Sequence, residues 1–169
     1  MSNEIVNKVA NSQLITIDLE ELYPQGTRTI IDIKNWLFQE LILKESEFRE
    51  HLKNHDWSQY KNQYIALTCS SDAIIPSWAF MLITTYVSPF AKKVVAGNLT
   101  ALETSIFYDI ISNFPVEDFK NKPVIIKGCA NKPIPETAYI QLIEKLQPIT
   151  RSIMFGEACS TVPLFKNNK

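Results

Sequence analysis

The chain has 169 residues, 46% of them hydrophobic, which is enough for one domain with a substantial buried core. Its 17 basic and 18 acidic side chains nearly cancel, and this balance argues against binding to nucleic acid or to an anionic membrane surface. The three cysteines are an odd number without a CxxC pair, so a secreted disulfide scaffold is excluded.

The first third of the sequence predicts short elements of both kinds. Runs of β-branched residues indicate strands, and Phe48 and Leu52 lie one helical turn apart among charged residues. In chain order we expect a helix at 3–10, strands at 14–18 and 29–33 with a turn at 23–26 between them, and a helix at 45–54. The pattern of residues 35–44 fits a helix and a strand equally well.

The other two thirds predict four strands that alternate with three helices. Proline opens the first and third of these helices, and Thr100 and Glu103 form a predicted capping box for the second. The expected strands are 64–68, 93–96, 124–127 and 152–155, and the expected helices are 77–87, one from Thr100 toward Pro115, and one from Pro135 toward Pro148. This alternation is typical of βαβ units around a parallel sheet.

We therefore predict one α/β domain over residues 1–169, with three layers and a mainly parallel sheet that carries helices on both faces. Residues 1–60 would pack on a core of residues 63–155. No internal repeat or polar linker marks a domain boundary. No basic leader and no apolar stretch of about 20 residues is visible, so we expect a cytoplasmic protein without a membrane span.

Each of the three cysteines follows a predicted strand. Cys69 comes directly after the strand at 64–68, whereas Cys129 and Cys159 follow the strands at 124–127 and 152–155. The carboxyl ends of parallel strands share one edge of a sheet, where α/β proteins bind their ligands. Thiolates are preferred ligands of zinc, of iron and of iron–sulfur clusters. The sequence thus predicts a metal centre held by these three cysteines.

Three other side chains are candidates for a fourth ligand or for a supporting role, namely His55, Asp72 and Glu157. His55 is preferred to His51 because it closes a predicted helix and an aromatic residue follows close behind it. Asp72 has an alternative role, since aspartate in such a loop commonly caps the next helix.

Two alternatives need no metal. In the first, Cys69 is the thiol of an enzyme or a sulfur carrier, because the amino terminus of a following helix lowers a thiol pKa, although the nearby Asp72 would raise it. In the second, the cysteines are buried and inert, and the protein binds a partner. The helix at 77–87 has almost no polar face, so it would then be the interface of a homo-oligomer.

Five stretches spread over nearly the whole chain carry a resemblance to a known family. They are residues 41–49, 54–57, 69–78, 127–129 together with 135–139, and 156–163. These segments resemble an uncharacterised bacterial family, domain of unknown function 2480. The family has no established activity to carry over. The resemblance implies genes beside those for iron–sulfur cluster assembly, which favours the three-thiolate site and assembly proteins as partners.

Overall fold

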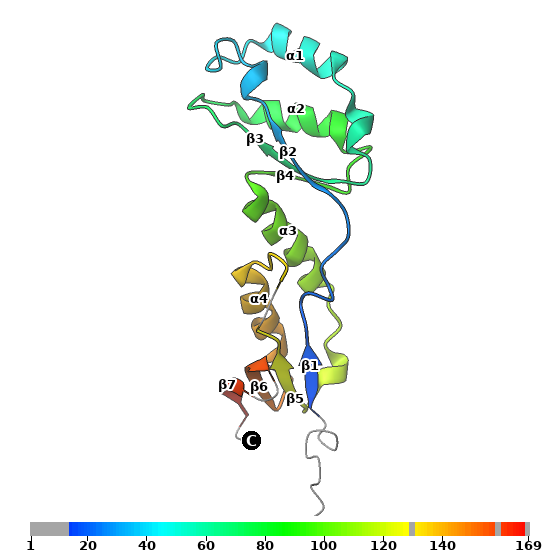
Figure 1. The fold of residues 1–169 in the computed structure, drawn as a ribbon, viewed down its shortest axis with the longest axis vertical. Helices are drawn as coiled ribbons and strands as arrows, with labels where there is room; N and C mark the ends of the chain where they lie inside the picture. Colours follow the sequence, from blue (N-terminus) through cyan, green and yellow to red (C-terminus); the bar gives the residue numbers. More distant parts are fainter. Residues whose placement is uncertain (1–13, 129–130, 158–159, 168–169) are drawn as a thin grey trace, which may run out of the picture. The chain divides into compact units, whose positions relative to one another are not determined.

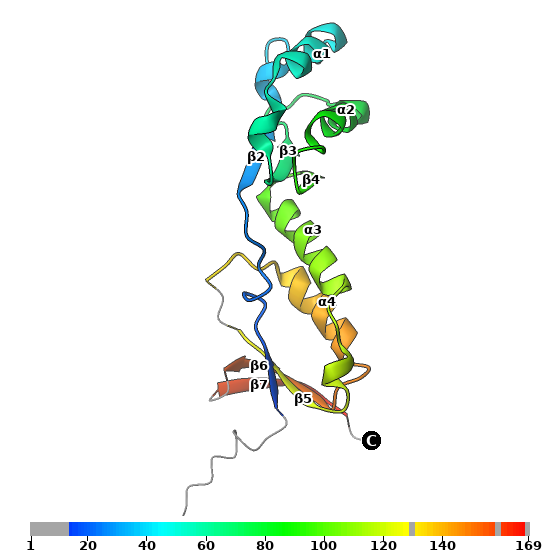
Figure 2. The same cartoon turned by 90° about the vertical axis from the view of Figure 1, so that its right-hand side faces the viewer.

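The computed structural model describes residues 14–128, 131–157 and 160–167. Helices and strands alternate along these parts of the chain (Figure 1; a second view is given in Figure 2). The strands are β1 (Ile15–Ile17), β2 (Arg28–Asp32), β3 (Tyr64–Thr68), β4 (Lys93–Ala96), β5 (Pro123–Ile126), β6 (Ser152–Glu157) and β7 (Ser160–Lys166). The α-helices are α1 (Glu45–Asn54), α2 (Ser77–Val87), α3 (Leu99–Ser112) and α4 (Glu136–Leu146), and the 3-10 helices are η1 (Lys34–Trp36), η2 (Trp57–Tyr60) and η3 (Glu117–Phe119).

The strands form two sheets, with the orders β2-β3-β4 and β1-β5-β6-β7. The first sheet belongs to a compact unit of residues 24–106, which we call the central unit. The second belongs to a unit made of residues 1–23 and 107–169, which we call the terminal unit. The α/β class and the mainly parallel pairing are confirmed, since only the β6–β7 pair is antiparallel within these sheets. The expectation of one sheet is wrong, because alternation along a sequence does not specify which strands become neighbours.

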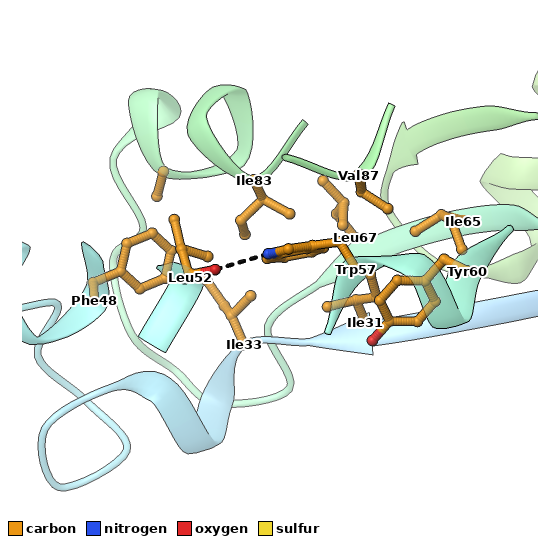
Figure 3. Packing of buried hydrophobic residues seen from close by; sticks show 11 residues of the cluster. Ile31, Ile33, Phe48, Leu52, Trp57, Tyr60, Ile65, Leu67, Ile83 and Val87 are labelled. Atoms are coloured by element: carbon orange, nitrogen blue, oxygen red, sulfur yellow. Dashed lines mark hydrogen bonds between the residues drawn. The ribbon is translucent and has the colours of Figure 1, made fainter. Parts of the chain in front are cut away.

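In the central unit, α1 and α2 pack on one face of the sheet. Alternate residues of β2 and β3 point toward these helices. The indole of Trp57 lies among the buried side chains of this core and donates a 2.8 Å hydrogen bond to the Leu52 carbonyl (Figure 3). On the opposite face, Arg28 of β2 forms a 2.7 Å ion pair with Glu103 in the first turns of α3. Helices therefore lie on both faces of this sheet, as predicted.

In the terminal unit, α4 and the last turns of α3 cover one face of the four-stranded sheet. The core there is formed by buried apolar side chains that include Phe107 and Ile111 of α3, Leu142 and Leu146 of α4, and Ile153 of β6. The first strand of the chain, β1, pairs with β5, so that this unit is assembled from the two ends of the sequence.

The two units contain a structural repeat that we did not predict from the sequence. Residues 57–97 form η2, β3, α2 and β4, and residues 116–156 form η3, β5, α4 and β6 in the same order. Counterparts lie 59 positions apart, as in the registers Tyr64↔Lys93 and Pro123↔Ser152. We call these segments the first and the second repeat.

The repeat extends to the turns. Asn62 and Asn121 are counterparts with φ values of 60° and 58°, and their amides donate to the carbonyls of Phe90 and Ile149 at 2.9 and 2.8 Å. The buried faces of the helices also correspond: Ala79, Ile83 and Val87 in α2, and Ala138, Leu142 and Leu146 in α4. Few residues are identical between the two repeats, so the sequence alone does not reveal them.

Most predicted elements are confirmed within a few residues. The helix at 3–10 lies outside the described residues, and the ambiguous segment 35–44 contains the end of η1 followed by turns. The capping box is wrong, because Asn98 accepts the hydrogen bond from the Ala101 amide and Glu103 instead pairs with Arg28. Strand β7 was missed because it contains Pro163, a residue that strands tolerate only at edges and irregularities. Pro163 indeed pairs with Met154, where the β6–β7 register shifts.

Candidate functional site

Cys69 lies at the carboxyl end of β3, in the first position of the loop that leads to α2. Its side chain is partly buried against the core of the central unit, and its sulfur lies 3.2 Å from the hydroxyl oxygen of Ser71. Cys69 is a free thiol. The position agrees with the prediction that this residue would stand at the ligand-binding edge of a parallel sheet.

The Cys69 loop is held by Asp32, at the end of the neighbouring strand β2. The Asp32 carboxylate accepts hydrogen bonds from the amides of Ser70 at 3.1 Å and of Lys34 at 3.0 Å. Burial raises the pKa of Asp32, but the hydrogen bonds from Ser70 and Lys34 and the charge of Lys34 bring the net pKa below its usual value. The carboxylate is thus ionised at neutral pH and fixes the backbone beside the thiol.

Lys34 supplies a positive charge near Cys69. Its ammonium group forms a 3.0 Å ion pair with Glu40, which raises the pKa of Lys34, and smaller contributions come from Asp32 and Cys69. The pair is solvent-exposed, so water and salt screen its field.

The segment between Cys69 and α2 differs from the prediction in one respect. Asp72 is exposed and does not cap α2, because the helix begins after Pro76 without any side-chain capping bond. Seven residues separate Cys69 from the first residue of α2. The effect of a helix dipole is confined to the first turn, so sequence proximity alone does not assign it to this thiol.

Cys129 and Cys159 lie outside the described residues. The strands before them, β5 and β6, are neighbours in the terminal unit, whereas β3 belongs to the other sheet. The premise that all three cysteines follow strands of one sheet is therefore wrong. The strand ends that precede Cys129 and Cys159 do share an edge: a Cβ at Gly128 would lie 2.9 Å from the Phe155 ring, so a larger residue at position 128 would require that ring to shift.

This edge of the terminal unit carries charged side chains that the sequence did not single out. Lys127 forms a 2.9 Å ion pair with Asp18, which lowers the pKa of Asp18 and raises that of Lys127. Glu157, a candidate ligand, lies close enough to contribute to the raised pKa of Lys127. Burial, followed by the charges of Asp18 and Glu20, raises the pKa of Tyr139.

Asp18 and Asp32 occupy equivalent places in the two units. Each ends an apolar run next to the first strand of a repeat. Each carboxylate also accepts a hydrogen bond from the backbone amide two positions later: Asp18 from Glu20 at 2.9 Å, and Asp32 from Lys34 at 3.0 Å. The similar runs Ile-Thr-Ile-Asp and Thr-Ile-Ile-Asp were a signal in the sequence for this correspondence.

His55 is part of an aromatic cluster of the central unit. Its Nε2 atom lies 2.8 Å from the Tyr60 hydroxyl, and its ring contacts those of Trp36 and Trp57. Burial lowers the pKa of His55, and the charge of Asp56 opposes this only in part. His51 is exposed on α1. Among the described residues, no three His, Cys, Asp or Glu side chains form a group that could hold a metal ion.

Residues 3–167 match the family model described as "Protein of unknown function (DUF2480)". The chain belongs to this family. Neither the curated proteins nor the solved structures contain a match to it. Within the described parts of this DUF2480 chain, no helix has the length and apolar character needed to cross a membrane.

Proposed function

We propose that Cys69 is the functional group of a cytoplasmic, thiol-dependent accessory protein that acts as a sulfur carrier or thiol enzyme. The observation that carries this proposal is the position of a partly buried free thiol at the carboxyl edge of a parallel sheet, in a loop held by Asp32. Thiols stay reduced in the cytoplasm, which suits this role.

Two polar side chains lie around the Cys69 sulfur. The Ser71 hydroxyl, 3.2 Å from the sulfur, can donate a hydrogen bond to it, and Lys34 adds a positive charge. In sulfur transfer, the Cys69 thiolate would attack the outer sulfur of a donor persulfide. The sulfur–sulfur bond of the donor breaks and a new one forms between the transferred sulfur and Cys69. The donor leaves as a thiolate that takes up the proton of the transferred sulfur, so Cys69 ends as a persulfide anion. Iron–sulfur assembly proteins, which the family resemblance suggested, would use such sulfur.

A variant that retains only Cys69, with Cys129→Ser and Cys159→Ser, tests the proposal. We expect its thiol to be alkylated faster than free cysteine at neutral pH, and to gain one sulfur atom when mixed with a small-molecule persulfide. Lys34→Met should slow alkylation, whereas Lys53→Met, which removes an exposed lysine of α1, should not. A thiol that reacts no faster than free cysteine and accepts no sulfur would refute this function.

A second candidate is a metal site for zinc, iron or an iron–sulfur cluster, with Cys129 and Cys159 of the terminal unit among its ligands. It is favoured by one observation, namely that the strands preceding Cys129 and Cys159 are hydrogen-bonded neighbours. Thiolates are the donor set that these metals prefer. As a further ligand, Glu157 of the same unit is better suited than His55, whose Nε2 already contacts Tyr60.

Anaerobic purification followed by elemental analysis and visible spectroscopy tests this second candidate. We expect about one metal site per chain, lost in Cys129→Ser and in Cys159→Ser but kept in Ser70→Ala, an exposed neighbour of Cys69. Metal-free protein, or metal that remains in both cysteine variants, would rule out this thiolate site and leave the Cys69 thiol function standing.

A further inference from the structure

The two repeats differ in what covers their last strand. In the terminal unit β6 is an inner strand, because β7 pairs with it in antiparallel orientation. Its counterpart β4 is the last strand of the central sheet among the described residues. Ile153 of β6 is fully buried, whereas its counterpart Val94 remains partly exposed. An apolar edge of this kind is unusual unless something covers it.

A hollow of about 650 Å³ runs between α2 and β4 in the central unit. Its walls are mostly apolar and include Leu67, Phe80 and Met81, and small side chains at Thr84 and Ala96 leave it open. In the second repeat larger residues stand at these two positions, Ile143 and Phe155, and Phe165 of β7 packs into the same core. In the terminal unit, larger side chains therefore occupy the place that is equivalent to this hollow of the central unit.

A second hollow, of about 420 Å³, lies on the other side of α2, toward α1. Met81 lines both hollows and is 67% exposed, so it forms a ridge between them. The only charged residues that line either hollow are Glu45 and Arg49, which neutralise each other in a 2.9 Å ion pair. A surface with a ridge beside mostly apolar hollows can be matched by a copy of itself turned by a two-fold axis.

We propose that this face, made of β4, α2 and the two hollows, binds a second copy of the chain. A two-fold axis beside β4 brings two β4 strands together in antiparallel orientation, the same sense in which β7 covers β6. The central sheets then continue across the axis, and Met81 of each copy enters a hollow of the other. The helix at 77–87 becomes the homo-oligomer interface that its apolar composition predicted.

Exposed apolar side chains supply about half of the area that each partner of a dimer buries. At about 150–250 Å² for a large side chain, the exposed parts of Ile74, Trp78 and Met81, which are 93, 36 and 67% exposed, come to roughly 400 Å². A stable interface buries roughly 800 Å² on each partner. The edge of β4 and the walls of the hollows would supply the remainder.

Sedimentation of the full chain in a reducing buffer tests this proposal independently of the thiol chemistry. We expect a reversible dimer at micromolar concentrations. Met81→Arg should weaken dimerisation by about tenfold or more, because it buries an unpaired charge. Ile140→Arg is the matched control, since Ile140 is the counterpart of Met81 in α4 and is 60% exposed. It should leave the dimer intact.

Ala96→Pro provides a second variant that acts on the strand. The Gly97 amide donates to the Leu67 carbonyl of β3, so the Ala96 amide points away from β3 by strand alternation. Proline at this place keeps the ladder to β3 but blocks pairing with another strand, and we expect monomers with an unchanged circular dichroism spectrum. A chain that stays monomeric, even if another protein binds this face, overturns the proposal, as does a dimer that both variants leave intact.

Discussion

Strand β6 of the terminal unit is covered by β7, whereas its counterpart β4 in the central unit is an edge strand of its sheet among the described residues. A glycine with a positive φ, Gly97 at 135°, follows β4, and its counterpart Gly156, at 127°, lies within β6. After Gly97, Asn98 caps α3, whereas strand β7 begins at Ser160, a few residues after Gly156. The two similar repeats therefore differ in whether the element that follows them covers their last strand.

The largest effect is expected from shortening the equivalent core residues Ile83 and Leu142. Both are fully buried, so Ile83→Ala and Leu142→Ala should each lower the free energy of unfolding by about 2–5 kcal/mol. The tryptophans, Trp36, Trp57 and Trp78, all lie in the central unit, so fluorescence follows its unfolding while circular dichroism follows both units.

We therefore expect Ile83→Ala to shift the fluorescence transition in urea and Leu142→Ala to shift the circular dichroism transition. The exposed counterparts Thr85 and Glu144, replaced by alanine, serve as controls and should change stability by less than about 0.5 kcal/mol. A loss below about 1 kcal/mol at either core position would contradict the equivalence of the two helices.

An intermediate effect is expected at the paired glycines. A Cβ at Gly156 would lie 2.5 Å from the Ser160 carbonyl oxygen, and a Cβ at Gly97 would lie 2.9 Å from the Ala101 Cβ. Both substitutions to alanine also strain a positive φ, and each should cost about 1–3 kcal/mol. Gly156→Ala should be the more costly, because it pushes against backbone within the β6–β7 hairpin. Thermal unfolding measures both, and an equal or larger loss for Gly97→Ala would contradict this account.

The smallest effect is expected from the paired aspartates. The folded-state pKa values of Asp18 and Asp32 are both lowered, so their stabilisation is present above the ordinary pKa of about 4 and is lost as the pH falls through the lower folded values. Asp18→Asn and Asp32→Asn should each cost about 1 kcal/mol at neutral pH.

Urea unfolding from pH 7 down to pH 3 tests this expectation. Each variant should lose stability less steeply below about pH 4 than the parent chain. Glu117→Gln, which changes an acidic residue of η3, is a control that should keep the parent profile. If both aspartate variants kept the parent profile, these carboxylates would not hold the strand ends as described.

The local elements could be predicted from the sequence, but their partners could not. Prolines at 76 and 135 and the spacing of apolar residues specified α2 and α4, since these signals act within a few residues. The division into two sheets depends on α3 leading from β4 to β5 of the other sheet, and a helix in a βαβ unit has the same local pattern.

The candidate site was predictable only in part for the same reason. Cys69 was found because it directly follows an apolar strand, but its neighbours Asp32 and Lys34 come from a segment far away in sequence. Asp18 and Lys127 meet through the pairing of β1 with β5, which no local signal specifies. The prediction that the three cysteines share one edge depended on which strands are neighbours. It was wrong because β3 belongs to a different sheet from β5 and β6.

The pairing of β1 with β5 also sets the order in which the chain can fold. The central unit is continuous in sequence, so all of it leaves the ribosome before the terminal unit has its second strand. Ile17 of β1 can pair with Ile126 of β5 only after β5 has been synthesised. Closing the long loop between these two strands costs less entropy once the residues of the loop are already compact. We therefore expect the central unit to fold first during synthesis, before the terminal unit is completed from the two ends of the chain.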